Sequence, residues 1–517
     1  MSILTVSNVT HGYGNRQILK DASFRLLKNE HVGLVGANGE GKTTFLDIIT
    51  GKRMPDEGDV AWCNRITIGY LDQHTALEKG MTIRKVLHGA FEHMYKLEKE
   101  MLESYDRMGD CTPEETEALM DEVGEIQETL EQGGFYILDS KIEEYANGFG
   151  LMEIGLDRDV SELSGGQRAK VLLTKLLLEN PMILILDEPT NFLDENHIIW
   201  LKRFLQNYEN AFILVSHDMA FLNDVVNVVY HVENAVLTRY KGNYNQFIEM
   251  HEVKKRQLEQ AYEKQQKEIA GLEDFVARNK ARAATANMAK SRQKKLESMD
   301  VIKLEKEKPK PTFAFSSART PARVIISANK LVLGYDEPLT SPVDVEVERN
   351  QKIAIRGING LGKTTLLKTL LGLIEPIAGE VEQGQFVEVG YFQQEERNSD
   401  LTAMEEIWKE FPGLTNGEVR AALAKCGLTT EHIESKMRVL SGGENAKVRL
   451  CKLMMRPMNL LVLDEPTNHL DVDAKAALKE AIRSYKGTVL LVSHEPEFYT
   501  DIVTDIWDVE AWTTKLA

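Results

Sequence analysis

One sequence pattern occurs twice in this chain, and it limits the possible folds more than any other feature. GANGEGKTT begins at Gly36, and GINGLGKTT begins at Gly357, 321 residues later. LSGGQRAKV and LSGGENAKV are 277 residues apart, and LDEPTNFLD and LDEPTNHLD keep that second spacing. Such repeats predict two domains of one fold. The first half carries 44 more residues (321 less 277), and these lie between Gln73 and Ser164.

Each half alternates strand-like apolar runs with helical stretches. HVGLVGAN, MILILDE and AFILVSH are such runs in the first half. This alternation predicts an α/β fold with a largely parallel sheet in each domain. We expect the first domain at 1–245 and the second at 322–517. The segment 246–321 between them contains EKEKPKP, whose prolines indicate an extended exit from a helix.

Composition and charge exclude several classes of protein. Four scattered Cys argue against a disulfide framework or a zinc site and suit a reducing cytoplasm. The N-terminus lacks a signal-peptide pattern, and no run reaches the ~18–20 apolar residues of a membrane span. The formal net charge of −18 disfavours general nucleic-acid binding, so any contact with a polyanion must be local. We expect a soluble cytoplasmic protein that contacts no membrane.

A glycine-rich loop follows an apolar strand and precedes a helical run in both halves. Glycines let the backbone wrap closely, so that N–H groups and the helix N-terminus face phosphate oxygens. Lys42 and Lys363 would reach the β- and γ-phosphates, and Thr43 and Thr364 would place a hydroxyl on Mg²⁺. Two matches in one repeated frame make a merely structural glycine turn a remote alternative. We expect ATP to contact Gly36, Asn38, Gly39, Gly41, Lys42, Thr43 and Thr44 in the first half, and Gly357, Asn359, Gly360, Gly362, Lys363, Thr364 and Thr365 in the second.

Carboxylates end an apolar strand in each half, in ILILDE and LLVLDE. Asp187 and Asp464 would hold the Mg²⁺ shell. Glu188 and Glu465 would polarise the attacking water. A strand that merely ends in an acidic turn is the alternative, and the phosphate loop beside it makes that remote.

Two aromatic pairs also recur in the repeat. Tyr13 and Tyr335 stand 23 and 22 residues before the phosphate loop and could stack on adenine, unless they are core tyrosines. His217 and His494 end VSH strands and could contact the γ-phosphate in catalysis, unless they are satisfied core histidines.

Two polar pairs have less certain roles. Gln73 and Gln394 end strand-like runs and could reach ATP, the metal or the water. Asp194 and Asp471 follow the catalytic carboxylates and could lie at the interface between the halves. A helix N-cap explains these two aspartates equally well.

LSGGQ and LSGGE indicate whether each nucleotide site is formed by one domain alone or by both domains together. Ser-Gly-Gly before a helix makes a second anion-binding N-terminus, which is surplus in a domain with its own phosphate loop. It makes sense if each Ser-Gly-Gly caps the ATP held by the other half. Two ATP molecules would then join the halves, and hydrolysis would release them. The residues expected in this role are Ser164, Gly165, Gly166 and Gln167 in the first half, and Ser441, Gly442, Gly443 and Glu444 in the second.

Taken together, these motifs resemble the set of the ATP-binding cassette, and two cassettes in one chain without a membrane span resemble the ABC-F family. The resemblance implies two tandem P-loop NTPase domains joined by an α-helical hairpin, in an ATPase that binds the ribosome near the tRNA exit site. Pairing of the two cassettes within one chain predicts a monomer. Two positions depart from the pattern: Phe192 stands where the second half has His469, and Glu444 replaces the signature Gln. Both catalytic Glu are present, so we expect two competent sites whose turnover need not be equal.

Residues 275–296 form a strip with seven Lys or Arg and no Asp or Glu. Apolar spacing predicts helices at about 248–277 and 287–306 that pair antiparallel. The positions expected in their seam are Val253, Leu258, Tyr262, Ile269, Leu272 and Val276 of the first helix, and Met288, Leu296 and Leu304 of the second. In ABC-F proteins this segment resembles a hairpin that contacts tRNA and ribosomal RNA. Its basic tip suits an RNA backbone, although a solvated charged hairpin is the alternative. The candidate RNA contacts are Arg278, Lys280, Arg282, Lys290, Arg292, Lys294 and Lys295.

The insertion of the first half has the opposite charge. Residues 88–132 hold fourteen acidic and three basic residues in a pattern that predicts a second helical hairpin. In the family this looks like the arm that touches the ribosomal stalk beside the exit site. A basic ribosomal protein is the partner we expect, and a merely solubilising lobe is the alternative.

The favoured interpretation is a ribosome-associated ATPase that acts on translation as ATP closes its cassettes. A housekeeping factor is favoured over antibiotic resistance by ribosome protection, because the hairpin tip of about nine residues (278–286) is short. The competing classes are an ATPase subunit of a transporter and a DNA-repair ATPase. The basic strip argues against the first, and the short linker argues against the second.

Overall fold

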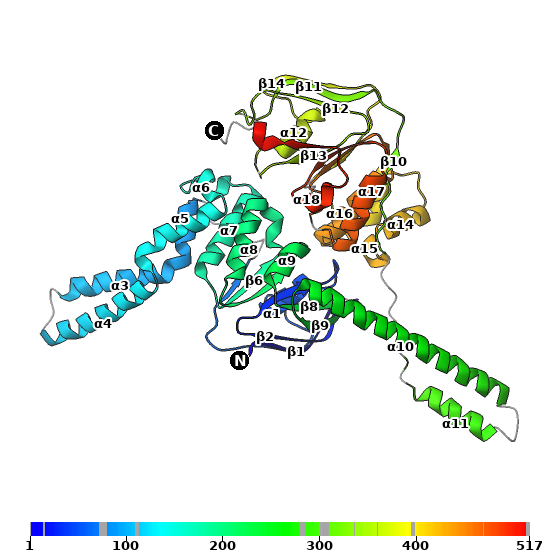
Figure 1. Ribbon diagram of the computed structural model, residues 1–517. Helices are drawn as coiled ribbons and strands as arrows, with labels where there is room; N and C mark the ends of the chain where they lie inside the picture. The colour runs from blue at the N-terminus through cyan, green and yellow to red at the C-terminus, as the bar shows by residue number, and fades with distance from the viewer. Residues whose placement is uncertain are drawn as a thin grey trace.

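Two α/β domains of the same architecture meet along one side, and two helical hairpins project from the first domain in different directions (Figure 1). This computed structural model describes residues 2–13, 16–71, 80–108, 113–279, 286–299, 301, 310–335, 337–358, 360–393, 399–468 and 470–512. The predicted fold class, with two tandem α/β domains joined by helices, is confirmed. Within the described part of the chain, no helix is long and apolar enough to cross a membrane.

The main sheet of the first domain has the strand order β5-β6-β7-β3-β8-β9, and every neighbouring pair is parallel except β8 and β9. Its strands are β3 (His31–Val35), β5 (Ile68–Tyr70), β6 (Ile183–Asp187), β7 (Ala211–Val215), β8 (Val228–Glu233) and β9 (Val236–Lys241). Strand β7 is buried at all five residues, as expected for a parallel strand with both faces covered. An antiparallel sheet in the order β2-β1-β4 lies beside it, with β1 (Ser2–Tyr13), β2 (Arg16–Leu27) and β4 (Glu57–Trp62).

Helices cover the main sheet of the first domain. They are α1 (Lys42–Ile49), α2 (Ile83–His88), α5 (Leu138–Gly148), α6 (Leu151–Ile154), α7 (Gly165–Glu179), α8 (Glu195–Gln206) and α9 (Met219–Val225). Two apolar cores result. One contains Phe45 of α1 with the antiparallel sheet, and the other contains Phe149, Leu177 and Leu201 on the opposite face.

The second domain repeats this plan with a five-stranded parallel sheet in the order β15-β17-β18-β13-β19. Its strands are β13 (Lys352–Arg356), β15 (Val389–Phe392), β17 (Leu460–Asp464), β18 (Thr488–Val492) and β19 (Asp505–Asp508), beside the antiparallel β11 (Val324–Val332), β12 (Val343–Glu348) and β14 (Ala378–Gln383). Its helices are α12 (Lys363–Leu370), α13 (Ala403–Glu410), α14 (Asn416–Lys425), α15 (Thr430–Glu434), α16 (Gly442–Met454), α17 (Val472–Ser484) and α18 (Pro496–Tyr499). In both domains the phosphate loop and the carboxylates therefore follow the carboxyl ends of two parallel strands, with one strand between them, at the same edge of the sheet.

The predicted acidic hairpin is present as α3 (Glu92–Met108) and α4 (Pro113–Gln132), at the left of Figure 1. Leu119, Val123 and Leu130 of α4 are buried and form the apolar side of this pair. Tyr105, which has the same helical spacing on α3, is exposed instead.

The linker forms the predicted second hairpin, from α10 (Tyr244–Asn279) and α11 (Ala286–Glu297). Its seam is shorter than the spacing predicted, because α11 pairs only with the outer part of α10. Val253 and Leu258 on the inner part of α10 were therefore wrongly assigned to the seam, and so was Met288 of α11; all three side chains are about half exposed. Residues 302–306 of the expected second helix lie outside the described residues.

After the hairpin, the chain is attached to the second domain. Strand β10 (Ser316–Ser317) pairs in parallel with β16 (Pro457–Met458), and the Thr312 N–H donates to the Lys425 carbonyl at 2.7 Å. Phe313 is buried in the core of the second domain. The first leg of the hairpin, by contrast, continues directly from β9 of the first domain.

Candidate ATP site between the two domains

The phosphate loop of the first domain connects β3 to α1 in a conformation that needs glycine. Gly39 and Gly41 have φ angles of 75° and 96°, in the left-handed region that side chains disfavour. Lys42 is buried at the start of α1, and its Nζ donates to the carbonyls of Gly36 at 2.8 Å and Ala37 at 3.1 Å. Burial lowers the pKa of Lys42. The loop thus concentrates N–H groups and one ammonium at a helix N-terminus, which suits an anionic phosphate.

A threonine hydroxyl and an aspartate meet beside each phosphate loop. Thr43 Oγ1 donates to Asp187 Oδ2 at 3.0 Å, and Thr364 Oγ1 donates to Asp464 Oδ2 at 2.8 Å. Burial raises the pKa of both aspartates, that of Asp464 to about 6.

This pair of oxygens fits a magnesium ion. Asp464 Oδ1 is buried with no hydrogen-bond partner within 3.5 Å among the described residues, although the Tyr391 hydroxyl is a neighbouring polar group. Threonine and aspartate oxygens are the ligands that Mg²⁺ prefers. Bound there with ATP, the ion would neutralise charge on the phosphates.

The glutamates that follow these aspartates contact the predicted histidines. Glu188 and Glu465 both adopt a φ of 50°, a strained conformation shared by the two halves. The His217 N–H donates to Glu188 Oε2 at 3.2 Å, and its Nε2 lies 2.9 Å from Asn38 Oδ1. In the second domain, His494 Nε2 lies 2.9 Å from Glu465 Oε1 and 3.0 Å from Lys363 Nζ. Both histidines therefore link a phosphate loop to a carboxylate and are not core residues.

Glu188 has the electrostatics of a group that can take up a proton. Burial, assisted by the charge of Asp187, raises its pKa from 4.5 to about 7. A carboxylate with a pKa near neutral pH can accept a proton from a water molecule that attacks the γ-phosphate.

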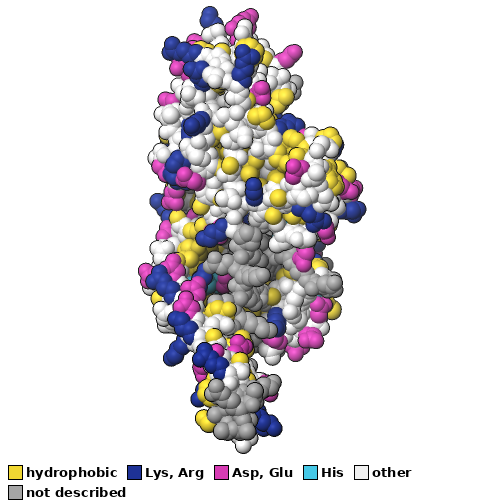
Figure 2. Space-filling view, turned by 90° about the vertical axis from the view of Figure 1, so that its right-hand side faces the viewer, with side chains coloured by type: hydrophobic (Ala, Val, Ile, Leu, Met, Phe, Trp, Pro, Cys, Tyr) yellow, Lys and Arg dark blue, Asp and Glu magenta, His cyan; other side chains and the backbone are white. Residues whose placement is uncertain are grey.

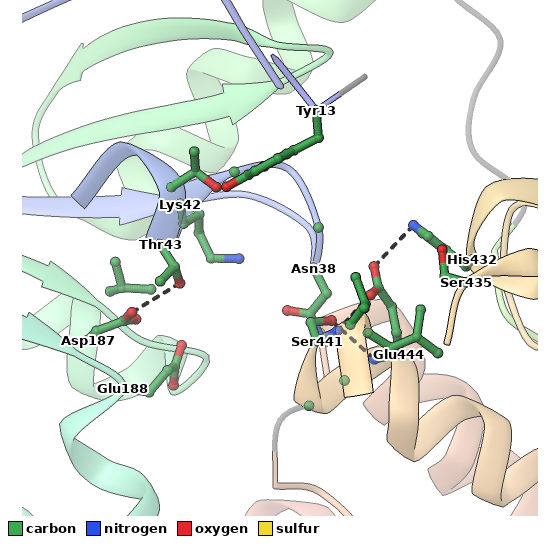
Figure 3. A pocket seen from close by; sticks show the side chains of 18 of the residues that line it. Tyr13, Asn38, Lys42, Thr43, Asp187, Glu188, His432, Ser435, Ser441 and Glu444 are labelled. Atoms are coloured by element: carbon green, nitrogen blue, oxygen red, sulfur yellow. Dashed lines mark hydrogen bonds and ion pairs between the residues drawn. The ribbon is translucent and has the colours of Figure 1, made fainter. Parts of the chain in front are cut away.

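A cavity of about 880 Å³ joins the two domains at this point. Its wall combines the first phosphate loop, Asp187, Glu188 and His217 with Ser441, Gly442 and Gly443 of the second domain. Figure 3 shows these two groups facing each other, with Asn38 between them. The structure thus brings the first phosphate loop and the second Ser-Gly-Gly to one cavity, as the surplus anion site in the repeat indicated.

Tyr13 lies at the rim of this cavity, where a flat base could stack on its ring. The side chain is 47% exposed, and Arg53 Cζ lies 5.1 Å from the ring centroid. Tyr335 of the second domain is 63% exposed. The alternative of two core tyrosines is therefore wrong.

Comparison with known proteins assigns the chain to a family. A family model described as "ABC transporter" matches residues 19–191 and 340–468, and a second model with that description matches 230–315. The "Uncharacterized ABC transporter ATP-binding protein YfmM" of Bacillus subtilis is 62% identical, over all of both chains. The "ABC transporter F family member 2" of Arabidopsis thaliana is 34% identical, over 98% of this chain and 76% of its own.

The chain belongs to the ABC-F family. Its two cassettes make it an ATPase. A solved structure described as a complex of archaeal ribosomal stalk protein aP1 and archaeal ribosome recycling factor aABCE1 has a TM-score of 0.56 and 21% identity. The match covers 97% of this chain and 87% of the solved chain, so the two proteins share the tandem arrangement of cassettes.

In this ABC-F protein, each signature serine caps the helix that follows it. Ser164 and Gln167 form a capping box on α7, and Ser441 and Glu444 form the same box on α16. The Ser441 N–H donates to Glu444 Oε2 at 2.8 Å, which leaves Oε1 free to lie 3.1 Å from His432 Nε2. Glu444 is therefore held at the cavity wall by two contacts (Figure 3).

Sequence reasoning missed His432, together with Glu431 and Ser435, which also line the cavity. These residues belong to α15 and the turn after it, just before the signature. At the spacing of 277, their counterparts in the first half are Ile154, Gly155 and Arg158, so the repeat gave no signal for them.

Asp194 and Asp471 are N-caps, and Asp471 also lines a cavity between the two domains. Asp194 Oδ1 accepts from the His197 N–H of α8, and Asp471 Oδ1 accepts from the Ala474 N–H of α17. Asp471 lines a second cavity of about 820 Å³ together with Lys42 and His217 of the other cassette. The charge of Asp194 likewise contributes to raising the pKa of Lys363, against the larger effect of burial. Both proposed roles are therefore compatible with the geometry.

Three residues of the expected ATP sites, Gln73, Asn359 and Gln394, lie outside the described residues. So do His469 and the side chain of Phe192. The roles of the two glutamines, and the effect of the Phe192 and His469 difference on turnover, stay predictions.

Proposed function

We propose that this ABC-F protein is a ribosome-associated ATPase that binds near the tRNA exit site and modulates translation. ATP closes the two cassettes, the basic hairpin then contacts tRNA or ribosomal RNA, and hydrolysis lets the protein leave. The observation that carries the proposal is the position of the hairpin. Its first leg, α10, lines a cavity that also contains Gly36, Asn38 and Lys42 of the phosphate loop.

The solved relatives support a ribosomal partner. Two neighbours in structure are described as an archaeal ribosome recycling factor with a ribosomal stalk protein, and as ribosome-bound archaeal Pelota and ABCE1. Those descriptions concern proteins of 21% and 22% identity to this chain. We propose that this protein also binds the ribosome, but we do not assign to it the specific activities that those descriptions name.

Five of the seven candidate RNA contacts lie among the described residues, and these five divide into two groups. Arg278 pairs with Asp274 at 2.8 Å, Lys295 pairs with Glu268 at 2.7 Å, and Arg292 stacks over Phe275 at 3.7 Å. These three stabilise the hairpin. Lys280 and Arg282 lie outside the described residues.

Lys290 and Lys294 on α11 form the second group, and we assign RNA contact to them first. Both are exposed, and no carboxylate of the described residues lies within ion-pair distance of either. Figure 2 shows basic and acidic side chains interspersed along the projecting hairpin, so the contact is local. A local cationic site suits a phosphate backbone and makes binding salt-dependent.

The acidic hairpin α3–α4 would meet a basic ribosomal protein. Glu117, Asp121 and Glu122 of α4 are exposed and have the same sign as RNA, which would repel them. A protein with a basic surface is therefore the partner of this arm, beside the RNA contact of the linker.

The test is ribosome pelleting of the Glu188→Gln, Glu465→Gln double variant with ATP and Mg²⁺, because loss of the catalytic carboxylates prolongs the closed state. We expect this variant to sediment with ribosomes. Lys290→Gln with Lys294→Gln in the same background should release it and reduce the dependence of binding on salt.

The matched control changes the same charge elsewhere. Lys28→Gln with Lys486→Gln removes two exposed lysines from the cassettes, and binding should stay. A double carboxylate variant that stays in the supernatant in every nucleotide state would refute the ribosomal function. Sedimentation with membranes instead would favour the transporter subunit.

A further inference from the structure

We propose that His231, Glu233 and His251 form a binding site for a divalent transition-metal ion of the zinc type, at the junction of the first cassette and the linker hairpin. This site is separate from the Mg²⁺ position beside the phosphate loop. It does not depend on the ribosomal function proposed above.

The three ligand atoms already lie close together. Glu233 Oε2 is 3.8 Å from His231 Nδ1 and 3.9 Å from His251 Nε2, and the three ligand atoms of the cluster lie within 4.8 Å of one another. Around a tetrahedral Zn²⁺ with bonds of about 2.0–2.1 Å, ligand atoms stand roughly 3.4 Å apart. Binding would therefore need a contraction of about half an ångström along each carboxylate contact, and of at most about 1.4 Å between the two histidine nitrogens.

The backbone explains why these side chains converge. His231 and Glu233 are two residues apart on β8, so they lie on the same face of the strand. His251 lies in the second turn of α10, and the His231 and His251 ring centroids are 4.8 Å apart. Phe247, buried on the same helix, packs against both rings at 5.2 and 5.6 Å.

The remaining ring contacts leave the correct atoms for a metal. Tyr240 Oη lies 3.4 Å from His251 Nδ1, on the ring edge away from Glu233, and can fix the ring orientation as outer-shell partners of metal ligands do.

The chemistry of the set selects the class of ion. Two imidazoles and one carboxylate suit Zn²⁺ and similar ions, whereas Mg²⁺ prefers oxygen ligands alone. The scattered cysteines argued against a zinc site in the sequence, but this cluster uses none of them. All three residues line the cavity of about 820 Å³, which leaves room for water or another ligand at a fourth position.

The position of the cluster gives a bound ion a structural consequence. A Cβ on Gly36 of the phosphate loop would lie 2.5 Å from the carbonyl oxygen of Val232, between the two β8 ligands. Strand β8 is therefore packed directly on the phosphate loop. An ion held by both β8 and α10 would tie the root of the hairpin to that strand.

The test is binding of Zn²⁺ to the full chain, measured by competition with a chromogenic chelator in the absence of nucleotide. We expect a site that takes up one equivalent of Zn²⁺. His251→Ala and Glu233→Gln should each lower its affinity at least about tenfold, since even outer-shell changes cost this much. His93→Ala, an exposed histidine on α3, is the matched control and should bind like the parent.

Two results would overturn the proposal. The first is an equal affinity for Zn²⁺ in the parent and in His251→Ala. The second is loss of Zn²⁺ binding in His217→Ala alone, which would assign the ion to the ATP site. X-ray absorption of the Zn²⁺-loaded parent identifies the ligands directly, so its result does not depend on whether the variants fold. Two imidazole ligands are expected, and a spectrum without imidazole would refute the site.

Discussion

One acidic side chain distinguishes the two Ser-Gly-Gly signatures. Glu444 and Gln167 occupy equivalent positions in the two capping boxes, but only Glu444 adds a carboxylate to the wall that faces a nucleotide. His432 lies against that carboxylate, at 3.1 Å. The first phosphate loop therefore faces a signature with a different charge from the one in its own domain.

Substituting each of these two residues by the other should change the affinity for ATP at the site that its signature faces, in opposite directions. In a Lys363→Ala background, Glu444→Gln should bind a fluorescent ATP analogue more tightly at the first site, by about threefold to tenfold, because a like charge is removed. Glutamine keeps the capping box, so thermal stability should change little. The reciprocal Gln167→Glu in a Lys42→Ala background should weaken the second site. Unchanged affinity in both variants would show that Glu444 does not face the nucleotide.

Asp194 makes stability depend on pH. Burial alone would raise the pKa of Asp194, but hydrogen bonding to His197 and the charge of Lys170 outweigh it and hold the pKa at about 2, below the ordinary 3.8. Because the folded pKa is the lower one, the carboxylate stabilises the fold above about pH 4, and this contribution is lost as the pH falls toward 2.

Asp194→Asn should therefore lower the free energy of unfolding by about 2 kcal/mol at pH 7. The difference in free energy of unfolding between the parent and the variant should become smaller below pH 4. Urea unfolding at several pH values measures both. Asp157→Asn breaks only the exposed pair with Arg84 and should change stability by less than about 0.5 kcal/mol. A gap that widens on acidification would contradict the assignment.

At the scale of elements, the sequence predicted the features that depend on local or repeated patterns, and it missed those that depend on tertiary contacts. The phosphate loops, the carboxylate-ended strands and both hairpins follow from local patterns, and the structure contains them. Val253 and Leu258 have helical spacing, but spacing cannot reveal that α11 is too short to reach them. The contact between β8 and α10 likewise joins residues with no shared motif, so His231 and His251 carried no signal.

The short seam predicts where the hairpin is weakest. Arg292→Ala removes the stack on Phe275, worth about 0.5–1 kcal/mol at an exposed site. Hydrogen exchange of the α11 amides should then accelerate about twofold to fivefold. Arg256→Ala removes an exposed pair with Glu252 on the inner part of α10 and serves as the control. Equal exchange of α11 in all three proteins would exclude a stabilising role for Arg292.

At the scale of the molecule, nucleotide binding and domain pairing share one set of residues. The first cavity has walls from both cassettes, and Asp471 reaches the second cavity beside Lys42 of the opposite domain. A ligand that contacts both walls stabilises their approach by its affinity for both. ATP is therefore expected to change the shape of the whole chain.

Small-angle X-ray scattering tests this expectation. The radius of gyration of the Glu188→Gln, Glu465→Gln variant should fall when ATP and Mg²⁺ are added. Lys42→Ala with Lys363→Ala lacks the phosphate-binding ammonium groups and should keep its radius. A radius that is unchanged in the carboxylate variant, with ATP shown to be bound, would contradict closure.

The attachment of the linker has a mechanical consequence. Its first leg leaves from β9 of one cassette, and its return is fastened through β10 and β16 to the other. At ~1.5 Å per residue, the 36-residue α10 is about 54 Å long. A rotation of about 10° at its root would sweep its far end through about 9 Å. Because the two legs are attached to different cassettes, a rotation of one cassette against the other would displace the far end of the hairpin by about this distance.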